Sequence, residues 1–487
     1  MKRKAKICVS ILITIVLIIS GMLTLTNIVQ RKSSDFKYNP FFAEEKDFDV
    51  LFFGTSHVIN AVFPMELWND YGITSYNFGG HGNEIATTYW TLINALDYSS
   101  PKLVVVDCLK LSSEAKAFKN ENYVHYSLDA FPLTSNKIKA ALDLMEKEKR
   151  LEFLWDFIIY HTRWNELTES DFVPTSNEEK GAEYRPAVGI PNEVPIIDIN
   201  EKSPSDTIAA TYLRKIIQTC QERNIDVLLT YLPFPASEEE QKEAHLAYDI
   251  ANEYGVNYIN FLDMPDCINY MTDCYDEDSH LNPSGARKVT DYLGKYITEH
   301  YSLNDKRSNI EYASWHDHYN QYTIRKYRHL KEQKKLDTAL MLLSDKNVSS
   351  CVFIKGESSL LQDTRVVELL QNISPFVNLD MLSSAISSGE DYFLLTDKEN
   401  VLESIGDDSL INLSSSFGNI NYINERNSDK TLSINATEDN FLTKLGNGQY
   451  ADAYIVAIDN LTREILYTAS FQTAGLDENN HLTATKN

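Results

Sequence analysis

Two hydrophobic patterns alternate along the chain before residue 301. Short runs that are apolar throughout predict strands buried on both faces, and they cover residues 49–53, 103–107, 225–232 and 256–261. Between these runs, apolar residues recur at helical spacing over residues 84–96, 137–160, 205–223 and 237–254. Buried strands that alternate with helices are typical of a parallel sheet covered on both faces. We therefore predict an α/β domain over residues 40–301.

The pattern changes in the last third of the chain. Residues 302–345 form a predicted helical connector, in which the spacing over residues 319–343 indicates one long helix. Short apolar runs separated by Asn, Asp, Ser and Gly follow, which predicts a β-rich domain over residues 346–475. Residues 476–487 form a polar tail. A length of 487 residues also favours two folded domains, because single hydrophobic cores stop growing at smaller sizes.

The N-terminal segment of residues 7–29 contains no charged side chain and is mostly Ile, Leu and Val. As a helix it would span roughly 34 Å, enough for a hydrocarbon core of about 30 Å. Basic residues are concentrated in the short tail of residues 1–6 that precedes it. This bias predicts a single-pass anchor with a cytoplasmic N-terminus and all later residues outside the cytoplasm. A cleaved signal peptide is the alternative, but the sequence lacks an A-x-A-like cleavage site, which favours an uncleaved anchor.

The charge balance restricts the class of partner. The chain has 45 basic and 70 acidic residues, a formal net charge of −25. Nucleic-acid recognition needs a surplus of Lys and Arg, so we expect no nucleic-acid partner. No pair of the six cysteines has metal-site spacing, and we expect neither a disulfide framework nor a metal ion or other cofactor.

Ser56 follows the first predicted strand in a turn that begins at Gly54, just before a predicted helix. The pattern places its hydroxyl at the carboxyl edge of a parallel sheet, where α/β folds carry their sites. The first backbone N–H groups of the next segment would point at whatever the hydroxyl attacks. A serine in such a turn is more often a helix cap than a nucleophile, so this feature alone is weak.

A second segment, residues 276–286 (Asp-Glu-Asp-Ser-His-Leu-Asn-Pro-Ser-Gly-Ala), opens the last predicted helix of the α/β domain. His280 offers the base that a serine nucleophile needs, and acids just before it could fix the tautomer of its ring. Taken alone, this segment is better interpreted as solvated capping residues, Ser284 among them, with His280 as a surface histidine.

Together these segments resemble the SGNH, or GDSL-like, hydrolase family over about residues 45–300. The turn at Ser56 resembles the family's first block, and residues 77–83 (Asn-Phe-Gly-Gly-His-Gly-Asn) resemble the second. The segment around His280 resembles the last block, Asp-x-x-His. The resemblance implies a flavodoxin-like sheet, Ser56 as nucleophile, His280 as base, and an oxyanion hole that includes the N–H groups of Ser56 and Gly82.

The sequence departs from the family pattern at two places. The third block, Gly-x-Asn-Asp, is absent, because residues 108–111 read Cys-Leu-Lys-Leu. The side-chain donor that this Asn usually gives the oxyanion must then come from elsewhere, and Asn83 or Asn60 could supply it. The position three before His280 holds Glu277 instead of Asp, with Asp276 and Asp278 beside it. Glu277 is our first choice for the carboxylate that orients His280, and Asp278 is our second.

Anchor, topology and degenerate blocks resemble one membrane-associated subgroup, the D-alanyl transfer protein of teichoic acid synthesis and the alginate O-acetylation proteins. The resemblance implies an extracytoplasmic esterase or O-acyltransferase that acts on a cell-envelope polysaccharide or teichoic-type polymer. It also implies a membrane-bound O-acyltransferase as partner. The alternative is a non-catalytic assembly or glycan-binding protein that keeps the fold. The missing third block favours this alternative, and the presence of Ser56 and His280 opposes it.

Several further histidines lie near the blocks or in the long insertion after the second strand. We interpret them as structural or substrate-facing groups, because a metal site needs three or four converging ligands. The residues concerned, with their polar and aromatic neighbours, are His57, His81, His125, His161, Asp129, Arg163 and Trp164. The aromatic stretch of residues 155–164 is interpreted as helix core, with aromatic residues that line a glycan cleft as the alternative.

Overall fold

The structure is a computed structural model, and it describes residues 2–30, 32–44, 46–172, 178–191, 201–406, 409–415, 418–424, 431–434, 451–477 and 481–486. By packing, the chain divides into two compact units. The first comprises Met1–Glu183, Pro195–Met264 and Thr290–His316, and the second Tyr184–Val194, Pro265–Val289 and Asp317–Asn487. This division differs from the predicted boundaries, because two internal segments pack with the C-terminal residues.

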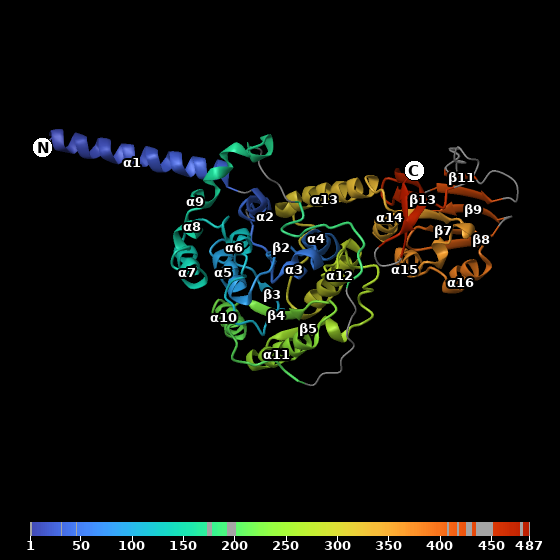
Figure 1. The fold of residues 1–487 in the computed structure, drawn as a ribbon, viewed down its shortest axis with the longest axis horizontal. Helices are drawn as coiled ribbons and strands as arrows, with labels where there is room; N and C mark the ends of the chain where they lie inside the picture. The colour runs from blue at the N-terminus through green and yellow to red at the C-terminus, as the bar shows by residue number, and fades with distance from the viewer. Residues whose placement is uncertain are drawn as a thin grey trace. The chain divides into compact units, whose positions relative to one another are not determined.

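The first unit is built on a five-stranded sheet with the order β2-β1-β3-β4-β5, and every neighbouring pair is parallel (Figure 1). The strands are β1 (Val50–Phe53), β2 (Ser75–Asn77), β3 (Leu103–Asp107), β4 (Asp226–Tyr231) and β5 (Asn257–Asn260). The chain order reverses at β1, and such switch points place a crevice at the carboxyl ends of the strands. The predicted fold class is confirmed.

Helices cover both faces of this sheet (Figure 1). One face carries α5 (Ile85–Ala95), α10 (Ile208–Glu222) and α11 (Glu238–Tyr254), and the other α4 (Pro64–Tyr71) with the later turns of α12 (Pro283–His300). Local sequence signals set their limits. Ser237 and Glu240 form a capping box at the start of α11, and Gly255 ends that helix in the left-handed conformation.

The insertion between β3 and β4 contains short helices in place of the single one predicted over residues 137–160. Its elements before α10 are α6 (Glu121–Leu128), α7 (Ser135–Leu144), α8 (Arg150–Leu154), α9 (Phe157–Tyr160) and the 3₁₀ turns η1 (His161–Asn165) and η2 (Glu169–Phe172). The prediction of one helix is wrong because the guanidinium of Arg150 closes α7. It donates to the carbonyls of Leu142 at 2.9 Å and Met145 at 3.2 Å.

The N-terminal helix α1 (Lys2–Val29) is followed by α2 (Lys32–Phe42). Residues Lys6–Val29 have a mean hydropathy of 2.7 and are exposed along most of their length, which is the pattern of a membrane anchor or a signal sequence. The structure therefore contains one N-terminal apolar helix that is long enough to cross a bilayer.

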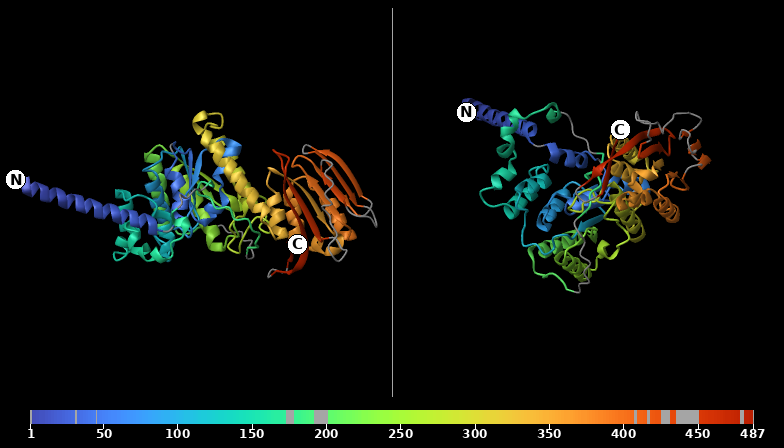
Figure 2. Two further views of the ribbon diagram at one scale, coloured as in Figure 1. Left: turned by 90° about the horizontal axis from the view of Figure 1, so that it is seen from above. Right: turned by 45° about the vertical axis from the view of Figure 1, so that its right-hand side comes forward.

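The second unit is built on a six-stranded antiparallel sheet of order β14-β13-β12-β6-β7-β8 (Figure 2). Its strands are β6 (Val348–Ile354), β7 (Tyr392–Thr396), β8 (Val401–Ile405), β12 (Ala453–Asp459), β13 (Ile465–Leu476) and β14 (Leu482–Lys486). A three-stranded sheet contains β9 (Ser409–Ser415), β10 (Gly418–Asn424) and β11 (Thr431–Ile434). Its helices include α14 (Leu336–Leu343), α15 (Thr364–Ile373) and α16 (Leu379–Ser388).

Alternate residues of β6 show how this unit packs. Val352 and Ile354 belong to the core that includes α14, α15 and α16, while Cys351 and Phe353 face a second cluster that includes Leu432 of β11. This period of two is the pattern expected of a strand buried on both faces. A separate antiparallel β domain follows the α/β domain, as the sequence indicated.

Two predictions about the C-terminal region are wrong. The helical pattern over residues 319–343 is divided between α13 (Ala313–Lys331) and α14, because the chain between them pairs with β14. Lys335 forms a β-bridge with Thr485, and the N–H of Lys486 donates to the carbonyl of Lys334 at 2.7 Å. The predicted polar tail therefore contains an edge strand.

Candidate active site

Ser56 is the first residue of α3 (Ser56–Ala61) and follows β1 by two residues at the carboxyl edge of the sheet. Gly54 makes this turn possible. Its φ is +151°, and a Cβ there would lie 2.6 Å from Cγ2 of Val58 and 2.9 Å from Cβ of Asp107. Thr55 caps the helix by accepting the N–H of His57 at 3.3 Å. The half-buried Ser56 hydroxyl thus starts from a turn of fixed shape.

The loop of residues 77–83 follows β2 and is tied to this turn. Asn77 donates its Nδ2 to the carbonyls of Val58 and Val62, at 2.7 and 2.9 Å, at the end of α3. The N–H of Gly80 donates to the carbonyl of Gly54 at 3.0 Å. A Cβ at Gly79 would lie 2.7 Å from the backbone N of Ile59, so only glycine fits there. The first two predicted blocks therefore form one packed structure.

Two lysines hold the carbonyl groups of this loop. The Nζ of Lys37, on α2, donates to the carbonyl of Gly79, and the Nζ of Lys110 donates to the carbonyl of Gly82 at 3.0 Å. Lys110 also pairs with Glu84 at 3.0 Å. Burial lowers the pKa of Lys37 to about 7, although the charge of Glu183 acts in the opposite direction.

Lys110 occupies the segment where the third block was expected. It has a φ of +72°, and its backbone N–H donates to Oε2 of Glu243 at 2.9 Å. Residues 108–111 therefore bring a cation to the loop rather than an amide donor to the oxyanion site. Sequence reasoning missed this role, because a lysine after a strand gives no sign of which carbonyl it reaches.

Asp107 ends β3 beside Gly54 and is fully buried. Its Oδ1 accepts the N–H of Leu232 at 2.9 Å, while its Oδ2 has no partner in the part of the chain that the structure describes. Its surroundings include apolar residues such as Phe52 and Val58. Burial raises its pKa to about 7, and the backbone hydrogen bonds only partly oppose this shift.

The expected oxyanion donors have different surroundings. Gly82 has a φ of +61°, and its N–H has no acceptor among the residues with described positions. The side chain of Asn83 is buried, where its Oδ1 accepts from Ser127 at 2.8 Å and its Nδ2 faces the Gly54 carbonyl at 3.5 Å. The Nδ2 of Asn60 donates to the carbonyl of Glu183 at 3.2 Å. Gly82 therefore offers an available donor, whereas both asparagines have structural partners.

His280 belongs to the second unit, so its surroundings are described within that unit. It lies on a hairpin closed by a bridge between Cys274 and Leu281, and the N–H of Tyr275 donates to its carbonyl at 2.9 Å. The rings of Tyr275 and His280 stack with centroids 5.6 Å apart. The side chain of His280 is 14% exposed, so the ring is held but remains accessible.

Asp276 is the carboxylate that orients His280. Its Oδ2 lies 2.8 Å from the Nδ1 of His280, and its Oδ1 accepts the backbone N–H of His280 at 3.0 Å. Glu277 and Asp278, the residues expected to make this contact, are exposed at the tip of the hairpin. The expectation is corrected because the turn, closed by Ser279 at a φ of +65°, returns the chain so that residue 276 faces residue 280. A hairpin turn cannot be read from the spacing of the acids.

The last block is supported by hydrogen bonds from Asn282. Its Oδ1 accepts the N–H groups of Ser284 and Gly285 at the start of α12, and its Nδ2 donates to the carbonyls of Thr272 and Cys274. This asparagine thereby fixes the hairpin to the first turn of the helix. The Leu-Asn-Pro-Ser-Gly sequence has a structural role next to His280.

The other histidines have local partners. His125 pairs with Asp129 at 2.7 Å inside the insertion. Burial tends to lower its pKa, but the hydrogen bond and charge of Asp129 outweigh it, so the pKa is raised. His81 lies 3.1 Å from Glu183 on the loop that follows β2. Among the described residues, one group has metal-ligand atoms within 4.8 Å of one another, namely Asp276, Asp278 and His280. Exposed acidic groups are common without a bound metal ion.

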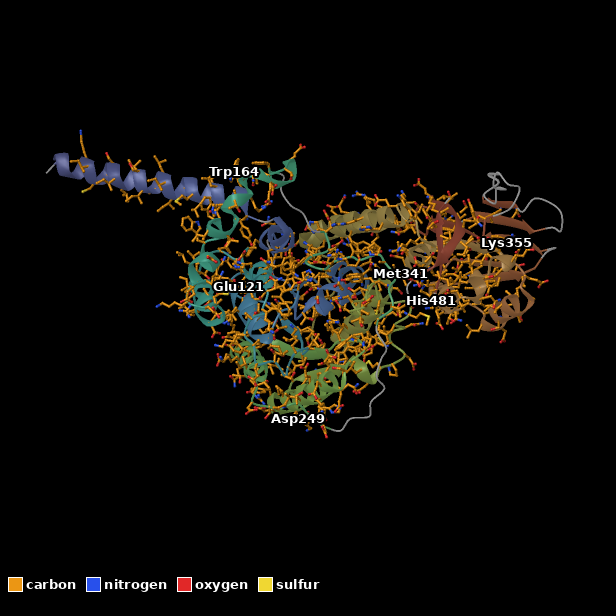
Figure 3. The ribbon with its side chains drawn as sticks, viewed as in Figure 1. Glu121, Trp164, Asp249, Met341, Lys355 and His481 are labelled. Atoms are coloured by element: carbon orange, nitrogen blue, oxygen red, sulfur yellow. The ribbon has the colours of Figure 1, made fainter. Side chains whose placement is uncertain are left out.

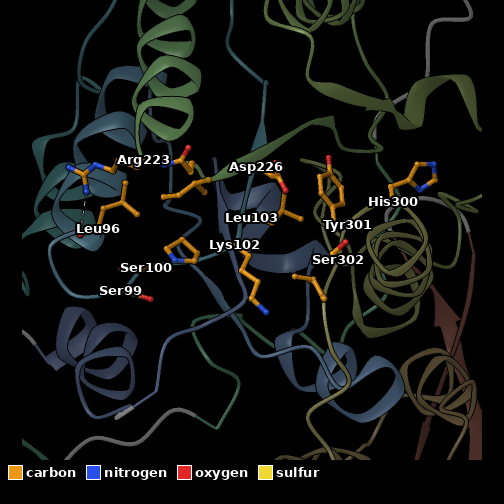
Figure 4. A pocket seen from close by; sticks show the side chains of 14 residues that line it. Leu96, Ser99, Ser100, Lys102, Leu103, Arg223, Asp226, His300, Tyr301 and Ser302 are labelled. Carbon is orange, nitrogen blue, oxygen red and sulfur yellow. Dashed lines mark hydrogen bonds between the residues drawn. The ribbon is translucent and has the colours of Figure 1, made fainter.

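A cleft of about 830 Å³ opens at the opposite, amino edge of the sheet (Figure 4). Its lining includes the starts of β3 and β4 and the residues that follow α12. Its charged groups have structural partners, since Lys102 pairs with Asp49 at 3.1 Å and Arg223 donates to the carbonyl of Leu96 at 3.4 Å. Ser56 lies at the opposite, carboxyl edge of the sheet. The large volume of this cleft therefore does not make it the candidate active site.

Comparison with known proteins gives structural matches only. No family model and no curated protein matches the chain. A crystal structure of a protein from Lactobacillus plantarum matches with a TM-score of 0.28 and 10% identity, over 53% of this chain and 100% of that one. An active-site mutant of a family two carbohydrate esterase from Clostridium thermocellum matches with a TM-score of 0.26 and 10% identity, over 53% of this chain and 65% of that one.

A mutant of the esterase AlinE4 matches with a TM-score of 0.21 and 12% identity, over 54% of this chain and 100% of that one. Each match extends over about half of this chain, and two of the three are to esterases. All three TM-scores are low, and the α/β fold is established by the strand order of the chain itself.

Proposed function

We propose that Ser56, His280 and Asp276 form a catalytic triad that acts on ester bonds. The Oγ of Ser56 attacks the acyl carbonyl carbon, and the Nε2 of His280 takes the hydroxyl proton. Asp276 keeps the other ring proton on Nδ1 and stabilises the imidazolium that forms. The N–H groups of Ser56 and Gly82 hold the oxyanion of the tetrahedral intermediate.

The second half of the reaction returns the proton. The imidazolium protonates the leaving alcohol as the acyl group becomes an ester on Ser56. His280 then takes a proton from the acceptor as the acceptor attacks the acyl-enzyme, and the imidazolium returns that proton to the Oγ of Ser56 as the serine leaves. Water as acceptor makes the protein an esterase, and a sugar or polyol hydroxyl makes it an O-acyltransferase. The same residues serve both reactions.

The observation that carries this proposal is the 2.8 Å contact between Asp276 and the Nδ1 of His280. A carboxylate at Nδ1 leaves Nε2 as the basic nitrogen, which is the arrangement that a serine nucleophile requires. The two lysines that donate to carbonyls of the loop of residues 77–83 add support. Each fixes the carbonyl that it contacts, at Gly79 or Gly82, and so restrains the orientation of the adjoining peptide group.

The site of action follows from α1. We propose that this helix is kept as an anchor and that the rest of the chain lies outside the cytoplasm. An enzyme placed there meets envelope polymers but not cytosolic acyl thioesters. Its acyl group would then come from a membrane-bound O-acyltransferase or would already be on a polysaccharide or teichoic-type polymer.

The test combines labelling with ester analysis. A fluorophosphonate probe should label the full-length protein in membranes, and Ser56→Ala and His280→Ala should abolish labelling without loss of folded protein. Ester content of the surface polymers should fall in Ser56→Ala cells if the protein is a transferase, and rise if it is an esterase. Unchanged labelling in both variants would contradict the proposal.

The second candidate is a non-catalytic protein that binds the polymer or assembles with the acyltransferase. The specific observation in its favour is the replacement of the third block by Lys110, which leaves the oxyanion site without its usual side-chain donor. In that case, deletion of the protein would change the envelope while Ser56→Ala and His280→Ala would leave every surface ester unchanged.

A further inference from the structure

We propose that residues 155–172 form an interfacial collar that lies in the lipid headgroup layer around the end of α1. The proposal rests on the proposed retention of α1 as an anchor. The collar would hold the α/β domain in contact with the bilayer surface, whereas a flexible linker after α1 would let the domain move away from it. The collar contains α9, η1 and η2, together with Trp155.

The collar is packed against the last turns of α1. The guanidinium of Arg163 donates to the carbonyls of Val29 and Gln30, each at 2.7 Å. These carbonyls are at the C-terminal end of the helix, which a cation stabilises. Arg163 in turn pairs with Asp171 at 3.0 Å, which links η1 to η2. Val29 is buried. A segment removed during export would not need these contacts.

Because the collar covers the last turns of α1, the exposed apolar part of the helix is about as long as the hydrocarbon core of a bilayer is thick. Thr26 and Val29 are covered, whereas the turns from Ile7 to Leu25 are largely exposed. These turns span roughly 28 Å at 1.5 Å per residue, close to a hydrocarbon core of about 30 Å. Residues that surround Thr26 would therefore lie where the hydrocarbon meets the headgroups.

The exposed side chains of the collar fit that layer. Trp164 is 72% exposed and Phe172 63% exposed, and Trp164 lies beside the end of α1 (Figure 3). Aromatic residues are enriched at the level of the headgroups, and tryptophan is favoured there because its ring is apolar with one polar edge. Exposed apolar side chains also occur on the neighbouring helices, with Ile138 and Leu142 on α7 and Leu151 on α8. Continuity with the exposed apolar helix identifies the occupant as lipid.

The experiment measures whether the collar contacts lipid in the full-length protein. Cysteines are placed by Trp164→Cys and Phe172→Cys, with Tyr248→Cys on α11 as the matched control, since Tyr248 is 57% exposed in the same unit. Cys8 and Cys267 are replaced by Ser, because the other native cysteines are buried. Each variant carries an environment-sensitive fluorophore in nanodiscs of phosphatidylcholine and phosphatidylglycerol, with or without a lipid quencher near the headgroup.

Labels at positions 164 and 172 should lose at least about half of their emission to the lipid quencher, as expected for groups in the headgroup boundary. The label at position 248 should keep its emission. Equal quenching at all three positions would overturn the collar. A cysteine at position 164 that is protected from labelling in native membranes but not in pure lipid would also overturn the collar. That result would assign the surface to a protein partner. Loss of residues 1–30, detected by mass spectrometry, would show that the anchor itself is wrong.

Discussion

Replacement of Asp276 by Asn tests the orientation of His280 with little change in shape. In the structure one carboxylate oxygen accepts the backbone N–H of His280 at 3.0 Å, and the other lies 2.8 Å from Nδ1. Asn keeps the first contact through its amide oxygen. Its amide N–H₂ group then faces Nδ1 and donates to it, which forces the ring proton onto Nε2. The ring would be present but in the tautomer that cannot accept a proton from Ser56.

The size of the effect follows from precedent and exposure. The same change in a serine protease triad lowers turnover by about 10⁴. The side chain of Asp276 is 31% exposed, so solvent screens part of its charge and places the expected loss nearer 10³. That factor corresponds to about 4 kcal/mol of transition-state stabilisation.

The assay is the rate of fluorophosphonate labelling of Ser56, which does not depend on the identity of the acceptor. Glu277→Gln and Asp278→Asn are matched controls on the same hairpin. Both residues are exposed at its tip, so labelling should stay within about twofold of the native rate. A native rate in Asp276→Asn together with a large loss in Glu277→Gln would refute the assignment.

Three further predictions concern the first unit. Lys110→Met should slow labelling by about 10- to 100-fold, because the carbonyl of Gly82 loses its partner and the loop of residues 77–83 loosens. It should also lower the thermal stability, because the buried carboxylate of Glu84 loses its ion pair. Asp107→Asn should stabilise the protein at pH 8, by up to about 4 kcal/mol, and have little effect near pH 4. The folded-state pKa of Asp107 is raised to about 7, so between about pH 4 and 7 the folded state binds a proton that the unfolded state has released. The native protein therefore loses stability as the pH rises through this range. Urea unfolding at several pH values measures the change in the free energy of unfolding. The mature protein should retain residues 1–30, which N-terminal sequencing of membrane-extracted protein checks.

Much of the first unit could be predicted because its strands are buried on both faces. Continuous apolar runs locate β1, β3, β4 and β5 to within a few residues. The strand β2 has only three residues, and two of them, Ser75 and Asn77, are polar, so no run marks it. Its place in the sheet depends on pairing with β1, a tertiary contact that the local sequence does not indicate. The insertion was predicted as one helix because periodicity does not register the cap that Arg150 supplies.

The candidate site was predicted in part for a related reason. Ser56 and the loop of residues 77–83 are local motifs, and the structure places that loop beside the turn that carries Ser56. The partner of His280 depends on how a hairpin turns, which four consecutive polar residues do not specify. The role of Lys110 depends on the reach of a long side chain to another strand's loop. Contacts between residues distant in sequence are the part that a single sequence does not reveal.

The attachment of Arg163 to the end of α1 has a consequence for timing. If α1 is kept as the proposed membrane helix, a domain joined to its end by these hydrogen bonds has little freedom to swing outward, so its reach above the bilayer is short. If the protein is also the proposed enzyme, polymer segments still attached to membrane carriers are held near it at high effective concentration, whereas segments further out are not. Ester modification would then be limited to a brief period in the growth of each chain, and its spacing along the polymer would record the rate of polymer export.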